Sequence, residues 1–236
     1  MADTRSSAET GRLFVVATPI GNLGDASPRA VETLGSVHAI AAEDTRRTRK
    51  LLAHFGISTR LISYHDHNED RVSRDVVALL EGGSDVALVS DAGTPLIADP
   101  GYRLVSLCAE QGLEVVTVPG PSAVTAALSI SGLPPQPFHF AGYLPRKGGQ
   151  RRTRLAALSE LPCTVIYYES PHRIAATLRD MRDVLGDRRA VVARELTKVH
   201  EEVLRGTLAE LSSLAASRSL KGEIVVVVAG AEDGVG

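Results

Sequence analysis

The stretch DVALVSDAGTPLIADPGY, residues 85–102, joins an apolar run to a rigid acidic loop and indicates the fold of the first half of the chain. The run VALV suits a strand that is buried on both faces. Acids, glycines and prolines follow it. We expect Asp99 and Pro100 to be the N-cap and first residue of a helix that ends at Gly112. This order of strand, loop and helix is typical of a parallel α/β sheet.

Similar strand-like runs alternate with amphipathic stretches on both sides of this unit. Strands are predicted at 13–17, 38–42, 61–65, 85–90 and 114–119. A helix is expected to open at Ser27-Pro28, because serine is a good N-cap and proline is tolerated at the first helical position. The alternation predicts a mostly parallel sheet with helices on both faces.

The second half, which begins with PGPSAVTAALSISGLPPQP at 119–137, has a different pattern. Helices are predicted at 121–131, at 170–186 and after Thr207, and strands at 138–143, 164–169, 190–195, 201–206 and 223–228. A short connection joins 190–195 to 201–206, which favours antiparallel pairing. We therefore predict an α/β protein of two α/β domains: a disordered tail at 1–11, a mostly parallel domain at 12–119 and a mixed-sheet domain at 120–236.

Composition restricts the classes of function. The 236 residues are 44% hydrophobic, which suits a well-cored protein, and the net charge of −2 excludes a uniformly basic nucleic-acid binder but permits local basic patches. No apolar run approaches the ~18 residues of a membrane span, and the polar N-terminus lacks the core of a signal peptide. Cys108 and Cys163 have no metal-ligand spacing, so we expect reduced thiols in a cytoplasmic protein.

Small-residue loops follow four predicted strands. They are TPIGN (18–22), AEDTR (42–46), SDAGTP (90–95) and PGPSA (119–123). Open α/β sheets bind ligands at such strand ends, and glycine lets a backbone approach closely. The sequence contains neither GxGxxG nor GxxxxGK[ST], and Asp91 and Asp99 would repel phosphate. Ordinary tight turns are the alternative; a cationic ligand rich in hydroxyls and amines, such as S-adenosylmethionine, fits the loops.

Eight collinear motifs carry a more specific resemblance. They are LFVVATPIGNLGDASPRAVETL, AAEDTRRTRKLL, SYHDHNE, ALVSDAGTPLIADPGYRLV, VPGPSAVTAAL, FAGYLPRKGGQRR, YYESPHRI and ARELTKVHEE. The chain resembles, from residue 13 to about 230, the ribosomal small-subunit methyltransferase I family. This family is the cytidine 2'-O-methyltransferase branch of the tetrapyrrole-methylase-like fold and acts on 16S ribosomal RNA.

The resemblance implies two α/β domains with S-adenosylmethionine in the cleft between them, and commonly a homodimer. The loop SDAGTP stands where members of the fold hold the cofactor by backbone. The implied cofactor contacts of the first half are Pro19, Ser90, Asp91, Ala92, Gly93 and Ile97. Those of the second half, where the motifs are looser, are Ser122, Ala123, Tyr168, Gly222, Glu223 and Ile224.

Methyl transfer from a sulfonium to a ribose hydroxyl requires in-line alignment, and a general base can assist. The candidate catalytic residues are His65, Glu169, Glu43 and Arg194. We favour His65 or Glu169 as base or orienter, because both follow predicted strands; helix caps and surface ion pairs are the alternative. The cluster HDHNE (65–69) is not diagnostic of a metal site, so no metal is predicted.

Two basic clusters suit contacts with RNA phosphates. The predicted RNA-binding residues are Arg46, Arg146, Lys147, Arg151, Arg152 and Arg154. The pair Gly148-Gly149 within the second cluster is interpreted as flexible, so that the cluster clamps onto RNA. A solvated charged face is the alternative. Neutralising Arg151 and Arg152 is expected to weaken RNA binding while cofactor affinity stays.

Two other functions remain open from the residues. One is a tetrapyrrole C-methyltransferase on the same fold, for which the basic RKGGQRR segment would hold carboxylates. The motifs AEDTR, YYESPHR and RELTK favour the ribosomal branch over it. The other is a non-catalytic RNA-binding assembly factor with a relic cofactor pocket, against which the intact small-residue loops argue. The predicted partner is the RNA of the small ribosomal subunit.

Overall fold

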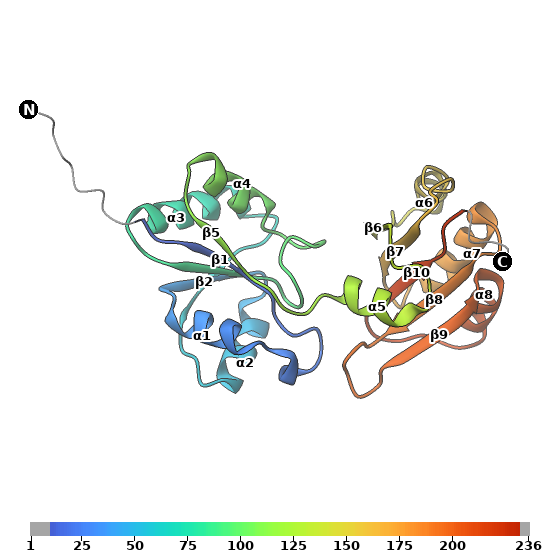
Figure 1. Cartoon of the computed structure of the whole chain (residues 1–236), viewed down its shortest axis with the longest axis horizontal. Coiled ribbons are helices and arrows are strands. Elements are labelled where there is room, and N and C mark those ends of the chain that lie inside the picture. Colours follow the sequence, from blue (N-terminus) through green and yellow to red (C-terminus); the bar gives the residue numbers. More distant parts are fainter. Residues whose placement is uncertain (1–9, 232–236) are drawn as a thin grey trace, which may run out of the picture. The chain divides into compact units, whose positions relative to one another are not determined.

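The computed structural model describes residues 10–231, and the chain divides into two compact units, Met1–Ser122 and Ala123–Gly236 (Figure 1). Residues 1–9 of the predicted tail lie outside the described residues. Gly11, also assigned to that tail, is buried, and its N–H donates to the Leu80 carbonyl at 2.7 Å. The predicted disorder therefore does not extend to Gly11, two residues before the first strand begins at Leu13.

The first unit is a five-stranded parallel sheet with the order β3-β2-β4-β1-β5. Its strands are β1 (Leu13–Val16), β2 (Ala39–Ala42), β3 (Arg60–Ser63), β4 (Val86–Val89) and β5 (Val115–Val118). Its helices are α1 (Pro28–Ser36), α2 (Thr45–His54), α3 (Glu69–Glu81) and α4 (Tyr102–Glu110), with a 3-10 turn at Leu23–Asp25. The predicted parallel sheet is confirmed.

Both faces of this sheet are buried, which explains the continuous apolar run in β4. Val86 and Leu88 face a core that includes residues of α3 and α4, whereas Ala87 and Val89 face a second core with residues of α1 and α2. Figure 1 shows these two helix pairs on opposite sides of the sheet. Such a sheet places its ligand-binding loops at the carboxyl ends of the strands.

The second unit is a five-stranded mixed sheet with the order β6-β7-β10-β8-β9. Its strands are β6 (Phe138–Tyr143), β7 (Thr164–Glu169), β8 (Arg189–Arg194), β9 (Glu202–Thr207) and β10 (Ile224–Val228). Its helices are α5 (Ala123–Ser131), α6 (Gly148–Ala156), α7 (Ile174–Leu185) and α8 (Leu208–Ser217). Strands β6 and β7 are parallel, and the other pairs, including the predicted pair β8 and β9, are antiparallel.

Apolar side chains of α6, α7 and α8 share one core with this second sheet, while α5 packs against β10. Ser27 caps α1 as predicted, with its hydroxyl accepting the Ala30 N–H at 3.1 Å. One predicted helix start and one interpretation of a loop were wrong. Helix α4 begins at Tyr102 with Gly101 as its N-cap, and the glycine pair read as flexible, Gly148-Gly149, is the first turn of α6.

Candidate functional site

The four small-residue loops of the first unit meet at the carboxyl edge of its sheet. Thr18 and Gly93 form an isolated bridge with reciprocal backbone hydrogen bonds of 2.8 and 3.0 Å. The Asp44 N–H donates to Asp91 Oδ1 at 2.9 Å, and the Thr94 hydroxyl donates to the Pro121 carbonyl at 3.1 Å. The predicted contacts Pro19, Ser90–Gly93 and Ser122 are therefore adjacent to, or part of, one bonded set of loops.

Two glycines of this edge stand where a side chain has little room. Gly93 has φ of 81°, in the left-handed region, and a Cβ there would lie 3.3 Å from Ile20 Cγ2. A Cβ on Gly120 would lie 3.1 Å from the Ala17 Cβ. Glycine therefore lets neighbouring loops approach backbone to backbone.

The loop after β4 stores backbone strain. Leu96 and Ala98 have φ of 71° and 69°, which residues with a Cβ rarely adopt. Asp99 is half-buried after this turn, and α4 begins only at Tyr102. Asp99 is therefore not the helix cap that its position before proline predicts.

Three carboxylates, Glu43, Asp91 and Asp99, form what we call the acidic edge. Burial raises the pKa of Glu43, and the charges of Asp91 and Asp99 raise it further. Burial also raises the pKa of Asp99 to about 6, with Asp91 contributing and the Ser90 hydrogen bond opposing. Among the described residues, Glu43 Oε2 is buried without a hydrogen-bond partner. The acidic edge therefore favours a cationic or hydrogen-bond-donating ligand.

The start of α2 partly compensates this charge. Asp44 caps the helix, accepting the Arg46 N–H at 2.8 Å, and its carboxylate also pairs with the Arg46 guanidinium at 3.1 Å. This contact holds the pKa of Asp44 down, at about 2. Arg47 lies 3.4 Å from Asp91. Arg46 remains largely exposed.

His65 follows β3, beside the end of β2. The Tyr64 N–H donates to the Ala42 carbonyl, so Glu43 and His65 leave neighbouring strand ends at the same edge. The His65 N–H donates to the side chain of Asn68 at 2.9 Å, and within residues 10–231 its Nδ1 is buried without a partner. Both predicted catalytic residues of the first unit therefore carry an unused polar atom at the acidic edge.

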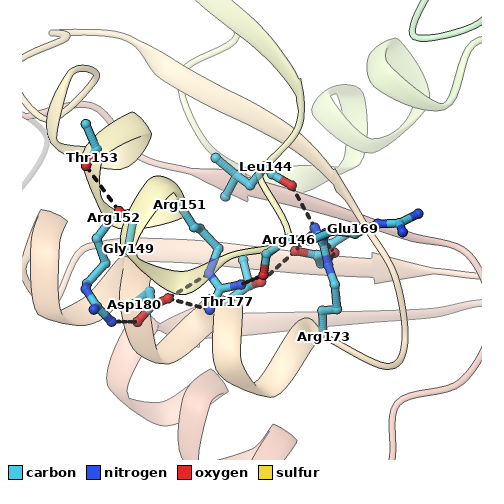
Figure 2. A network of polar contacts seen from close by, with 10 residues as sticks. All are labelled: Leu144, Arg146, Gly149, Arg151, Arg152, Thr153, Glu169, Arg173, Thr177 and Asp180. Atoms are coloured by element: carbon cyan, nitrogen blue, oxygen red, sulfur yellow. Dashed lines mark hydrogen bonds and ion pairs between the residues drawn. The ribbon is translucent and has the colours of Figure 1, made fainter.

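Glu169, predicted as a base or orienter, is the centre of a buried polar network in the second unit (Figure 2). Its carboxylate accepts from Arg173 Nε and Nη2 at 2.8 and 3.0 Å, and from the Thr177 hydroxyl at 2.6 Å. The Ser170 N–H adds a fourth bond, and the side chain is 1% exposed. We therefore remove Glu169 from the candidate bases, because its oxygens are already engaged by protein donors.

Arg194 supports the loop between β8 and β9. Its guanidinium donates to the carbonyls of Lys221 and His200 at 2.7 and 3.2 Å, and it pairs with Glu202. These contacts give Arg194 a structural role, and its catalytic role stays a prediction. The loop contains two left-handed residues, Glu195 and Thr197, with φ of 50° and 66°.

The predicted residues Gly222 and Glu223 lie against this strained loop. Glu195 and Glu223 are joined by backbone bonding, and Lys198 Nζ bridges their carboxylates at 2.9 and 3.0 Å. Gly222 has φ of 90°, and a Cβ there would lie 2.3 Å from the Glu195 carboxyl carbon. Ile224 is 3% exposed within the sheet core, so its side chain is not a cofactor contact.

An aromatic cluster lies where β6 and β7 end. The ring of Tyr168, a predicted cofactor contact, lies 4.9 Å from that of Phe140 and 5.5 Å from that of Tyr143. Tyr143 is 61% exposed and immediately precedes the loop to α6. The sequence analysis missed Tyr143, although an aromatic residue three positions before a basic run was a signal for stacking on bases. Ala123, the remaining predicted contact, begins α5.

The basic segment, residues 146–154, includes the start of α6. Arg146, Lys147, Arg152 and Arg154 are exposed, as phosphate contacts require. Arg151 is 6% exposed and pairs with Asp180, so its predicted phosphate contact was wrong: the Arg151 charge is neutralised by Asp180 inside the unit.

Within the described part of the chain, no three metal-ligating side chains lie close enough together to hold a metal ion. No helix of that part has the length and apolar character to cross a membrane.

Comparisons with known proteins agree with this architecture. Residues 12–212 match the model of the Tetrapyrrole (Corrin/Porphyrin) Methylases. A cobalt precorrin-4 methyltransferase structure, 15% identical, aligns with a TM-score of 0.70 over 98% of this chain and 99% of that chain. A Thermus thermophilus uroporphyrin-III C-methyltransferase complexed with S-adenyl homocysteine, 16% identical, aligns at 0.65 over 94% and 98%. The fold and its site loops thus define a methylase of the tetrapyrrole methylase class.

Close relatives narrow this class. A ribosomal RNA small subunit methyltransferase I of Xylella fastidiosa is 54% identical over 94% of this chain and 83% of its own length. The protein of the same name in Pseudomonas aeruginosa is 54% identical over 93% and 79%. The chain belongs to the ribosomal RNA small subunit methyltransferase I family.

Proposed function

We propose that the protein transfers a methyl group from S-adenosylmethionine to the ribose 2'-hydroxyl of a cytidine in the 16S RNA of the small ribosomal subunit. The observation that carries this proposal is the 54% identity, over 94% of the chain, to a protein named for that RNA. The ordered loops at the acidic edge support an active enzyme over a non-catalytic assembly factor. We further propose that it acts in the cytoplasm as a homodimer.

The first unit fits the cofactor in its chemistry. When bound, S-adenosylmethionine supplies an electrophilic methyl group on a positively charged sulfur. Gly93 and Gly120 bring backbone close to the ligand space, and the unpaired buried oxygen of Glu43 offers an acceptor. The carboxylates of the acidic edge favour a cation, and a cation there stabilises their ionised forms. Contacts from Tyr168, Gly222 and Glu223 remain predictions.

Proton transfer is assigned to the acidic edge. Methylation of a hydroxyl releases its proton. Among the described residues, Thr18, Glu43 and His65 each carry a buried polar atom without a partner beside the proposed ligand loops, and of these Glu43 and His65 are the types that act as bases. Burial and neighbouring carboxylates raise the pKa of Glu43, which strengthens it as a base relative to an exposed carboxylate. In this scheme Glu43 or His65 takes the proton, while backbone contacts from Ser90 to Gly93 hold the cofactor for in-line transfer.

The test is transfer of labelled methyl from S-adenosylmethionine to purified small subunits that lack the modification, followed by nucleoside analysis. The expected product is 2'-O-methylcytidine. A label on a base, or on a nucleoside other than cytidine, would overturn the assigned position. Label in a tetrapyrrole, with none in RNA, would instead favour the C-methyltransferase function that the fold also supports.

A further inference from the structure

Two buried carboxylates hold the backbone that leads into the basic segment (Figure 2). Arg173, paired with Glu169, donates from Nη2 to the Leu144 carbonyl at 2.9 Å. Arg151, paired with Asp180, donates from Nη1 to the Arg146 carbonyl at 3.4 Å. The loop between β6 and α6 is therefore attached at two points that flank Pro145.

Asp180 also acts on the first turns of α6 through two arginines. Its Oδ2 accepts from Arg151 Nε at 2.6 Å, and its Oδ1 accepts from Arg152 Nη1 at 3.2 Å. The Asp180 and Arg151 side chains are 9% and 8% exposed, whereas that of Arg152 is 55% exposed. Asp180 thus holds the Arg151 side chain in the interior and engages one guanidinium nitrogen of Arg152 at the surface.

The charges of the segment divide into two sets. Arg151 is cancelled inside the unit, and Arg146, Lys147 and Arg154 remain exposed, with Arg152 shared between Asp180 and solvent. If the basic segment bound RNA only through its total charge, loss of the Asp180 charge would raise its affinity for RNA. If it binds through the positions of its side chains, the same change would lower that affinity.

We infer that Asp180 is a positioning residue for RNA: through Arg151 it sets the Arg146–Lys147 loop and α6 so that their exposed cations match the phosphates of the substrate. This inference rests on the proposed function and adds to it a residue that does not touch RNA. Preorganised cations bind phosphates with less loss of side-chain and loop entropy than a flexible clamp. The ordered first turn of α6 replaces the flexible glycine pair in this role.

Asp180→Asn tests the inference, because the two descriptions predict opposite signs. The variant adds one positive charge to the region, so a purely electrostatic patch would bind small-subunit RNA more tightly. Positioning predicts weaker binding, with Kd and the KM for subunits raised about 5- to 10-fold while kcat and the KM for S-adenosylmethionine stay unchanged. Asp183→Asn on the same helix is the matched control, since Asp183 is exposed and pairs with its neighbour Arg182.

Further variants separate positioning from unfolding. Asp180→Glu keeps the charge and is expected to restore most of the affinity. Arg151→Met with Asp180→Leu removes both charges and leaves neither buried alone, so it is expected to fold while binding RNA weakly. Wild-type affinity in this double variant would overturn the inference, as would unchanged or tighter binding by Asp180→Asn. A wild-type protein that neither binds nor methylates small subunits would overturn the proposed function itself.

Discussion

The acidic edge of the first unit and the basic segment of the second unit handle charge in opposite ways. At the acidic edge, burial and the charges of Asp91 and Asp99 raise the pKa of Glu43, and an oxygen of Glu43 is left buried without a partner among the described residues. In the basic segment, the buried charge is cancelled by Asp180. Carboxylates that lack a protein partner indicate a ligand-binding site, whereas a buried charge that is paired within the protein indicates a structural role.

Glu169→Gln tests the architectural side of this comparison and has the largest expected effect. The variant leaves Arg173 without its buried partner, so we expect the free energy of unfolding to fall by about 3–5 kcal/mol. Urea unfolding of the purified protein measures this change. Glu160→Gln, an exposed carboxylate of the same unit, is the control and is expected to change stability by less than about 0.5 kcal/mol.

The activity of the same variant sharpens the comparison. Folded Glu169→Gln is expected to keep its kcat, because the carboxylate supports structure and takes no proton. If His65 is the base, His65→Ala is expected to lower kcat by about 100-fold or more. If Glu43 is the base, Glu43→Gln is expected to lower kcat by the same factor. A large loss of kcat in Glu169→Gln without a loss of stability would return Glu169 to the catalytic set.

Gly93→Ala tests whether the acidic edge binds the cofactor. Its Cβ would press on Ile20, displace the loop after β4, and lower kcat/KM by on the order of 100-fold. Gly56→Ala is the matched control: its φ of 68° is equally left-handed, and a Cβ there meets open space. Isothermal titration with S-adenosylmethionine reads the difference directly. Equal losses of affinity in both variants would mean that backbone strain, not the site, explains the effect.

Asp99→Asn has a smaller and pH-dependent effect. The folded protein holds the Asp99 proton up to about pH 6, against an ordinary pKa of 3.8, so burial of this group costs stability as the pH rises through that range. Asparagine removes the cost. We expect the melting temperature of the cofactor-free variant to exceed that of the wild type by about 3 °C at pH 8 and to match it near pH 4.

The control for this pH dependence is Asp75→Asn, an exposed carboxylate that pairs with Arg71 on α3. It is expected to lower the melting temperature slightly or leave it unchanged at pH 8. An Asp99 variant that is no more stable than the wild type at pH 8 would mean that Asp99 is solvated when ionised. The acidic edge would then be less suited to a cationic ligand than its burial indicates.

Local patterns predicted the strands and the convergence of the loops well. The continuous apolar run VALV at 86–89 is sufficient to predict a strand buried on both faces. Loops that follow parallel strands meet at one edge of the sheet. The start of α4 was missed because Asp99-Pro100 has the local pattern of a helix cap, while Leu96 and Ala98 have left-handed φ angles, Asp99 is half-buried and the helix begins at Tyr102. The sequence Asp-Pro is the same whether the aspartate caps a helix or is half-buried before it.

The roles of Glu169 and Arg151 were missed for a related reason. Both residues are of the types that catalysis and RNA binding use, and their partners are distant or look incidental. Arg151 pairs with Asp180, 29 positions away, and the Glu169 carboxylate accepts from Thr177 on the next helix. Whether a charge is free depends on such tertiary pairs, which composition and spacing do not encode.

The smallest expected effect separates exposed cations within the two basic clusters. Arg146→Gln removes an exposed cation of the basic segment, so RNA affinity should fall several-fold and the slope of log K against log salt should decrease by about one. Arg46→Gln should do less, because the Arg46 charge is already shared with Asp44 at 3.1 Å. Filter binding across a salt series measures both. Equal slopes of log K against log salt for the two variants would show that the exposed Arg46 still contacts RNA although it pairs with Asp44. The buried pair of Arg151 with Asp180 would then differ from it.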